Sequence, residues 1–174
     1  MGQFMPMRIF GASLALLGAV LMGIKYALKL SAHISALNSL IEALEIFTAE
    51  LEARAESLPR IIYHMSMHSK GEAASFFSRL DKSMDKLGRE EFSALWSVAA
   101  EESLLSLGDE LSDFSRLGAI MGRAELETQL KALRSCSQLL RQRLCALQLD
   151  YPQKRRLGLA LSAGAGLMLI IVLI

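Results

Sequence analysis

Two pairs of side chains in this sequence have spacings that could support metal or redox chemistry. His64 and His68 are four residues apart, which on a helix places both imidazoles on one face, within reach of one metal ion. Cys136 and Cys145, the two cysteines, are nine residues apart on one predicted helix, about 180° apart around its axis. The cysteines therefore cannot pair with each other, and no third ligand accompanies the histidines. We expect interfacial histidines and small buried thiols in a reducing compartment.

Catalytic and nucleic-acid-binding signatures are missing from the sequence. It contains no H-E-x-x-H, no G-x-x-x-x-G-K-[ST] or G-x-G-x-x-G phosphate-binding loop, and no G-x-S-x-G elbow. The 19 basic and 18 acidic residues give a net charge of +1, without a basic stripe interleaved with aromatic residues. We therefore expect a protein that is not an enzyme, has no catalytic, metal-binding or cofactor-binding residues, and does not bind nucleic acid.

The elements that position these residues are predicted to be helices. The chain is 52% hydrophobic and has only three prolines, and in residues 31–153 the apolar residues recur at spacings of three and four. Proline at position 59 is expected to end one helix and open the next. Tyr151 and Pro152 are expected to interrupt the last helix with a kink. The predicted helices cover residues 31–57, 59–68, 72–87, 89–101, 106–122 and 124–149.

The inward faces of these helices predict the core of an antiparallel helical bundle, for which about 120 residues suffice. Trp96, the only tryptophan, is expected to anchor this core between helices. The inward positions are Ile34, Leu37, Leu40, Ile41, Leu44, Phe47, Leu51, Ala73, Phe76, Phe77, Leu80, Met84, Leu87, Phe92, Leu95, Ala99, Leu111, Phe114, Leu117, Ile120, Met121, Leu126, Leu130, Leu133, Leu140, Leu144 and Leu147.

Long apolar runs lie at both ends of the sequence. Residues 157–174 contain no charge, and a helix of that length covers roughly 27 Å, close to the ~30 Å hydrocarbon core of a bilayer. Residues 9–24 form a second apolar run, which resumes after Lys25. A buried core helix is the alternative for the last run, and a signal peptide for the first, although no small-x-small cleavage site follows it. We predict transmembrane helices at 7–28 and 157–174.

Basic residues next to the two runs predict the orientation of the protein. Because cations near a membrane span favour the cytoplasmic side, the middle domain, residues 29–153, is expected to be cytoplasmic in a two-pass arrangement. The flanking cations are Lys25, Lys29, Lys154, Arg155 and Arg156.

Small residues recur at every fourth position in both apolar runs. Such a stripe lets helix backbones approach closely in lipid, which favours association of the two spans or of neighbouring subunits, including a homo-oligomer. The helix-packing candidates are Gly11, Ala15, Ala19, Gly23, Gly158, Ser162 and Gly166.

From residue 7 to residue 174 the chain resembles the stage III sporulation protein AB family. The order of parts matches: a short apolar start, a helical soluble domain, and a basic cluster followed by Leu-Gly and an apolar tail. The family's F-G-x-x-L-G-x-x-D-x-x-x-Q motif corresponds here to Leu117-Gly118, Met121-Gly122, Glu125 and Gln129, and its tryptophan corresponds to Trp96. Glutamate replaces the motif's aspartate at Glu125, and the family's T-P-L segment reads Ser57-Leu58-Pro59.

This resemblance implies a protein of the mother-cell membrane around the forespore in endospore-forming bacteria. The soluble domain would be similar to that of the F-type platform protein of type II secretion. A cytoplasmic ATPase, stage III sporulation protein AA, would dock on it, and other membrane subunits of the same operon would complete a channel or secretion complex needed for forespore development. The alternative is a membrane-tethered adaptor that recruits a soluble signalling factor.

Overall fold

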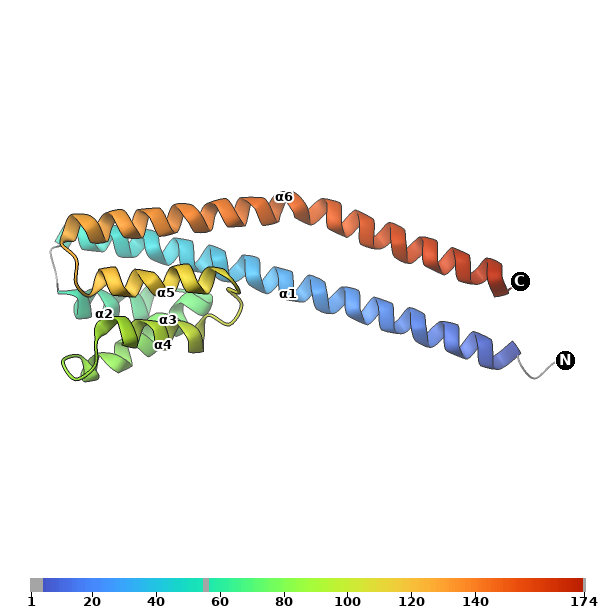
Figure 1. The fold of residues 1–174 in the computed structure, drawn as a ribbon, viewed down its shortest axis with the longest axis horizontal. Coiled ribbons are helices and arrows are strands. Elements are labelled where there is room, and N and C mark those ends of the chain that lie inside the picture. Colours follow the sequence, from blue (N-terminus) through green and yellow to red (C-terminus); the bar gives the residue numbers. More distant parts are fainter. Residues whose placement is uncertain (1–4, 55–56, 174) are drawn as a thin grey trace. The chain divides into compact units, whose positions relative to one another are not determined.

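A computed structural model describes the backbone of residues 5–54 and 57–173, and the side chains of residues 18, 21, 23–25, 27–53 and 57–149. Over these residues the chain forms α-helices, one short 3-10 helix and no strand, which confirms the predicted all-α class (Figure 1). The elements are α1 (Met5–Arg54), α2 (Leu58–His68), α3 (Gly71–Ser83), η1 (Met84–Lys86), α4 (Phe92–Ser103), α5 (Glu110–Met121) and α6 (Leu126–Leu173).

The chain divides into two compact units. One unit is Ala32–Cys145, which we call the bundle. It contains the C-terminal part of α1, helices α2 to α5, and the N-terminal part of α6. The other unit is formed by Met1–Ser31 and Ala146–Ile174. Helices α1 and α6 therefore contribute to both units, and each helix is continuous across the boundary.

Within the bundle, α1 and α6 run antiparallel, because Glu45 pairs with Arg141 while Glu52, further along α1, pairs with the earlier residue Arg134. Helices α2, α3, α4 and α5 pack in chain order, each on the next. Figure 1 shows these four shorter helices beside the α1 and α6 segments of the bundle. The connections between consecutive helices are short, which is typical of antiparallel helical neighbours.

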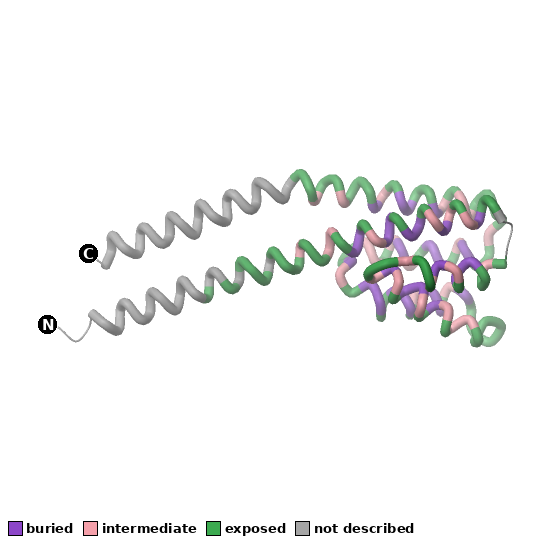
Figure 2. The backbone as a smooth tube through the Cα atoms, turned by 180° about the vertical axis from the view of Figure 1, so that it is seen from behind, coloured by how far each residue is buried: buried purple, intermediate pink, exposed green. Residues whose placement is uncertain are grey.

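The core lies between the helices of the bundle, where Figure 2 shows buried residues on the inner faces. The helical periodicity of the sequence predicted most of the core correctly. For example, the predicted inward positions of α1 from Leu37 to Leu51 are all at most 6% exposed. Trp96 is fully buried, which confirms its predicted role as a core anchor. The largest fully buried side chains are Trp96, Phe47, Phe76, Phe77, Phe114, Leu37, Leu40, Leu44, Ile61, Ile62, Met65 and Leu80.

The prediction that Leu87 and Leu126 belong to the core is wrong, because their exposed fractions are 43% and 46%. Helix α3 ends at Ser83, four residues before the predicted end, and η1 leads into a turn at Gly88, whose φ of 101° ends the helical path. Leu87 therefore lies in a turn rather than on a helix face. Leu126 is the first residue of α6, where the helix begins.

Other boundaries also differ from expectation by a few residues. Ser57 precedes α2, and Pro59 lies in its first turn. Proline is tolerated there because the backbone N–H that it lacks would have no partner within the helix. Helix α4 starts three residues later than predicted, at Phe92, and α5 starts at Glu110.

Helix α6 extends from Leu126 to Leu173, so Tyr151 and Pro152 do not end it, and the kink expected at these residues stays a prediction. A proline removes one N–H donor, and a helix with long segments on both sides can accommodate that loss. Among the residues whose side chains are described, no helix holds a stretch long and apolar enough to cross a membrane. Residues 157–174 and most of 7–28 lie outside those side chains, so both spans stay predictions.

Candidate functional site

The family-motif tryptophan and first glycine meet where α4 packs on α5. The indole of Trp96 is surrounded by aromatic rings, with centroid distances of 4.8 Å to Phe76 and 5.1 Å to Phe114. Its Nε1–H donates to the carbonyl oxygen of Phe114 at 3.0 Å. The indole is thus held both by packing and by a hydrogen bond, which satisfies its one polar group in a buried place.

Gly118 and Gly122 let α5 approach α4 closely. A Cβ placed on Gly118 would lie 2.6 Å from both Cβ and Cδ1 of Trp96, and one placed on Gly122 would lie 3.0 Å from Cβ of Phe92. Gly122 has an ordinary helical φ of −81° and caps α5. Packing space is therefore the reason for glycine at both positions.

The remaining motif residues lie at the junction of α5 and α6. The Nε2 amide of Gln129 donates to the carbonyl oxygens of Met121 and Ala124, both at 2.9 Å. Met121 is the last residue of α5 and Ala124 follows it, in the region where a helix leaves its last carbonyls without partners. Glu125 immediately precedes α6; its side chain is exposed, and its carbonyl accepts from the N–H of Gln129 at 3.0 Å. The motif therefore builds the α4–α5–α6 corner.

Replacing Gln129 by alanine is expected to lower the free energy of unfolding by about 1–3 kcal/mol, because two partly buried carbonyls lose their donor. Urea unfolding followed by circular dichroism measures the change. Gln142→Ala is the matched control, since Gln142 is exposed on the same helix and its loss should cost less than about 0.5 kcal/mol. Equal costs for the two variants would contradict this role of Gln129.

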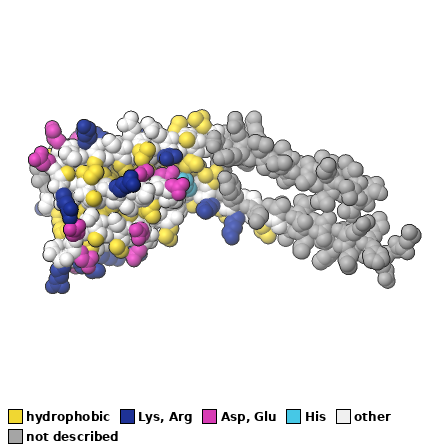
Figure 3. Space-filling model, viewed as in Figure 1, with side chains coloured by type: hydrophobic (Ala, Val, Ile, Leu, Met, Phe, Trp, Pro, Cys, Tyr) yellow, Lys and Arg dark blue, Asp and Glu magenta, His cyan; other side chains and the backbone are white. Residues whose placement is uncertain are grey.

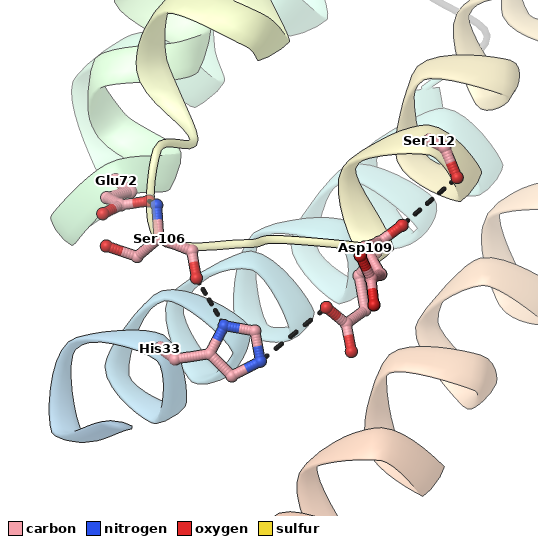
Figure 4. A network of polar contacts seen from close by, with 6 residues as sticks. His33, Glu72, Ser106, Asp109 and Ser112 are labelled. Atoms are coloured by element: carbon pink, nitrogen blue, oxygen red, sulfur yellow. Dashed lines mark hydrogen bonds and ion pairs between the residues drawn. The ribbon is translucent and has the colours of Figure 1, made fainter. Parts of the chain in front are cut away.

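A polar network that the sequence analysis did not anticipate joins α1 to the loop between α4 and α5 (Figure 4). The Nδ1–H of His33 donates to the carbonyl oxygen of Ser106, and its Nε2 lies 3.7 Å from Oε2 of Glu110. The backbone N–H of Ser106 donates to Oε2 of Glu72 at 3.3 Å. Residues from α1, α3 and α5 thus converge on one loop and fix its backbone.

One local signal for this network was present in the sequence. Gly108 has a φ of 64°, which glycine adopts without strain, and a Cβ there would lie 4.0 Å from Cε1 of His33. Glycine between Leu107 and Asp109 indicates a tight turn. Nothing local indicates that His33, 73 residues earlier, contacts this turn.

His64 and His68 do lie on one face of α2, with ring centroids 4.1 Å apart and the rings stacked. Nδ1 of His68 donates to the carbonyl oxygen of His64 at 2.9 Å, and Nδ1 of His64 lies 3.7 Å from Oε1 of Glu50. No group of three or more possible metal-ligating residues occurs among the described side chains. His64 thus faces Glu50 on α1, as expected for an interfacial histidine, whereas His68 is exposed.

The two cysteines lie in different environments, and neither forms a disulfide. Cys145 is exposed, whereas Cys136 faces the core. Burial raises the pKa of Cys136 to about 11, and the carboxylate of Asp113 adds to the rise. A thiol that stays protonated in this way is a poor nucleophile.

The raised pKa of Cys136 predicts a loss of stability in alkali. Between about pH 9 and pH 11 the folded protein keeps a thiol proton that the unfolded chain releases, so unfolding becomes more favourable as the pH rises. The expected loss is roughly 2–3 kcal/mol over that range. Urea midpoints of the wild type and of Cys136→Ala at both ends of the range isolate this contribution from other titrating groups. An identical loss in the two proteins would contradict it.

A groove of about 310 Å³ runs along the bundle between α1 and α6. Ion pairs from Arg141 to Glu45 and from Arg134 to Glu52 cross it, and all four side chains are at least 40% exposed. Such exposed pairs contribute little stability. The lining is polar or small: Glu45, Thr48, Ala49, Glu52, Arg134, Ser137, Gln138 and Arg141.

The predicted membrane-flanking residues are described only in part. Lys25 and Lys29 are exposed on α1. Gly23 is exposed, and a Cβ there would have no atom within 4 Å among the described contacts. The side chains of Lys154, Arg155 and Arg156, and of the helix-packing candidates Gly11, Ala15, Ala19, Gly158, Ser162 and Gly166, lie outside the described residues.

Comparison with known proteins gives two matches. The family model described as stage III sporulation protein AB matches residues 8–174. A solved structure described as stage III sporulation protein AB has a TM-score of 0.62 and 15% sequence identity, and the likeness covers 70% of this chain and 98% of that chain. At this identity the likeness shows a shared fold. No protein among the curated sequences matches the chain.

Proposed function

Because the chain belongs to the stage III sporulation protein AB family, which is not a family of known enzymes, we propose that it is a membrane platform subunit without catalytic activity. In this role the bundle faces the mother-cell cytoplasm and docks an ATPase, stage III sporulation protein AA. The apolar ends hold it in the membrane around the forespore, beside the other membrane subunits of the same operon.

The single observation that carries this proposal is the continuity of α1 and α6. These helices have 50 and 48 residues; α1 contains the uncharged apolar run 9–24 and α6 most of the run 157–174, and each helix continues into the bundle. A force applied to the bundle would therefore reach the apolar segments through hydrogen-bonded helix rather than through a flexible linker. That coupling suits a platform between a motor and membrane subunits.

The bundle also has the properties of a rigid docking body. Its core is aromatic and closely packed, and its inter-helix loops are fixed by contacts such as that between His33 and Ser106. Charged side chains of both signs are scattered over the described part of the face in Figure 3, so no single-sign field on this face favours a nucleic acid or another anionic partner. Binding of a folded protein surface fits these features.

The proposal is tested by titrating the purified ATPase against the full-length protein in lipid nanodiscs. We expect saturable binding, measured by surface plasmon resonance, that empty nanodiscs do not show. Absence of binding, with both proteins shown to be folded by circular dichroism, would refute the docking role.

A second experiment separates the platform from a simple tether. Both apolar segments are replaced by unrelated membrane spans while the bundle is left unchanged. A platform that packs specifically in the membrane is expected to lose sporulation and complex assembly but keep ATPase binding. Full sporulation after the exchange would favour the membrane-tethered adaptor instead.

A further inference from the structure

Leu105, in the loop between α4 and α5, presents an unusually exposed apolar side chain. It is 80% exposed, more than any other large hydrophobic residue in the described part of the chain, whereas Leu104 and Leu107 on either side are fully buried. A single exposed leucine is ordinary on a protein surface. The backbone here, however, is fixed by contacts of Ser106 with His33 and Glu72, so the loop holds Leu105 outward.

The loop contacts His33, a residue that lies close along α1 to the first predicted membrane segment. His33, which contacts the loop, follows Leu28 by five residues of continuous helix, or about 7.5 Å at 1.5 Å per residue. The headgroup layer on each side of the hydrocarbon core is roughly 5–8 Å thick. The helical path of α1 therefore keeps His33 within about one headgroup layer of Leu28, measured along the helix axis.

We propose that Leu105 inserts into the interfacial layer of the bilayer, so that the α4–α5 loop forms a third membrane contact beside the two apolar segments. This inference rests on the membrane location in the proposed function. A contact away from both helices restricts rotation of the bundle and so keeps its docking surface in one direction.

The chemistry of the loop indicates an apolar contact rather than attraction to anionic lipid. The carboxylate of Glu102 pairs with Arg79 at 2.6 Å, and that of Glu110 faces His33. Glu101 and Asp109 are exposed, and no cation lies within the loop itself. Insertion should therefore occur in zwitterionic phosphatidylcholine and should persist at high salt, since screening does not weaken an apolar contact.

The test uses the full-length Leu105→Trp variant in phosphatidylcholine vesicles with acyl chains brominated near the headgroup, because bromine quenches indole fluorescence on contact. The native Trp96 is fully buried, and its fluorescence is the background signal. This background is measured on the wild-type protein in the same vesicles. We expect brominated lipid to remove most of the emission added by Leu105→Trp, with no recovery in high salt.

Two further variants make each outcome decisive. Leu28→Trp reports on the first apolar segment, and Leu87→Trp places the same probe in an exposed turn of the bundle. Quenching at positions 28 and 105 but not at 87 is the expected result. Quenching at 28 alone would overturn the loop contact and leave the membrane location standing. No quenching at 28 would overturn both, and equal quenching at 87 and 105 would indicate unspecific adsorption and overturn the loop contact.

Discussion

Gly118→Ala is expected to destabilise the bundle by about 1–3 kcal/mol, although alanine is the better helix former. The added methyl would lie 2.6 Å from Cβ and Cδ1 of Trp96, below any normal carbon contact. The indole cannot move away easily, because Phe76 and Phe114 pack against it and Nε1 is hydrogen-bonded. Helix propensity favours alanine by at most about 1 kcal/mol, so the steric cost should exceed it.

Thermal and urea unfolding of the purified protein measure this cost, and a double-mutant cycle identifies its cause. In a Trp96→Gly background both the Cβ and the indole of residue 96 are gone and the methyl has space, so Gly118→Ala should become neutral or stabilising. Gly122→Ala, where the nearest atom of Phe92 is at 3.0 Å, should cost less than Gly118→Ala. An unchanged cost of Gly118→Ala without the side chain of residue 96 would contradict the proposed close approach.

Trp96→Ala is expected to lower the free energy of unfolding by about 3–5 kcal/mol, which is the largest effect we predict for a single substitution. The indole is fully buried among Phe76, Phe92 and Phe114, so its removal leaves a cavity that the surrounding rings cannot fill without leaving their own contacts. Such a loss is a large fraction of the 5–15 kcal/mol that stabilises a typical domain.

Circular dichroism in urea measures this loss, because the variant lacks the tryptophan fluorescence. Trp96→Phe keeps most of the volume and loses the hydrogen bond to Phe114, so it should cost less than Trp96→Ala. Val98→Ala is the surface control on the same helix, since Val98 is 54% exposed, and it should cost less than about 0.5 kcal/mol. A comparable loss for Val98→Ala would show that α4 itself, rather than the buried indole, is sensitive.

The sequence predicted the helices well because helical periodicity and helix-breaking residues are local signals. The inward face of α1 from Leu37 to Leu51 and the break before Pro59 follow from spacing and from the chemistry of proline. Trp96 could be assigned to the core for the same reason, since it shares a helix face with Phe92 and Leu95.

Periodicity fails where burial depends on how far a neighbouring helix extends. Leu126 has the correct spacing for an inward position, but α6 is paired with α1 so that Arg134 meets Glu52. Helix α1 ends only two residues after Glu52, at Arg54, whereas Leu126 lies eight residues before Arg134. It therefore extends past the end of its neighbour and remains 46% exposed.

The sequence alone determined that the bundle is helical, which helix faces turn inward, and that both ends are apolar, because each of these depends on residues within a few positions of one another. Only the tertiary structure decided that His33 holds the loop at Ser106 and that Gly118 admits Trp96. These contacts join residues 73 and 22 positions apart and depend on how the helices are aligned along one another. A period of 3.6 residues specifies a helix face but carries no information about that alignment.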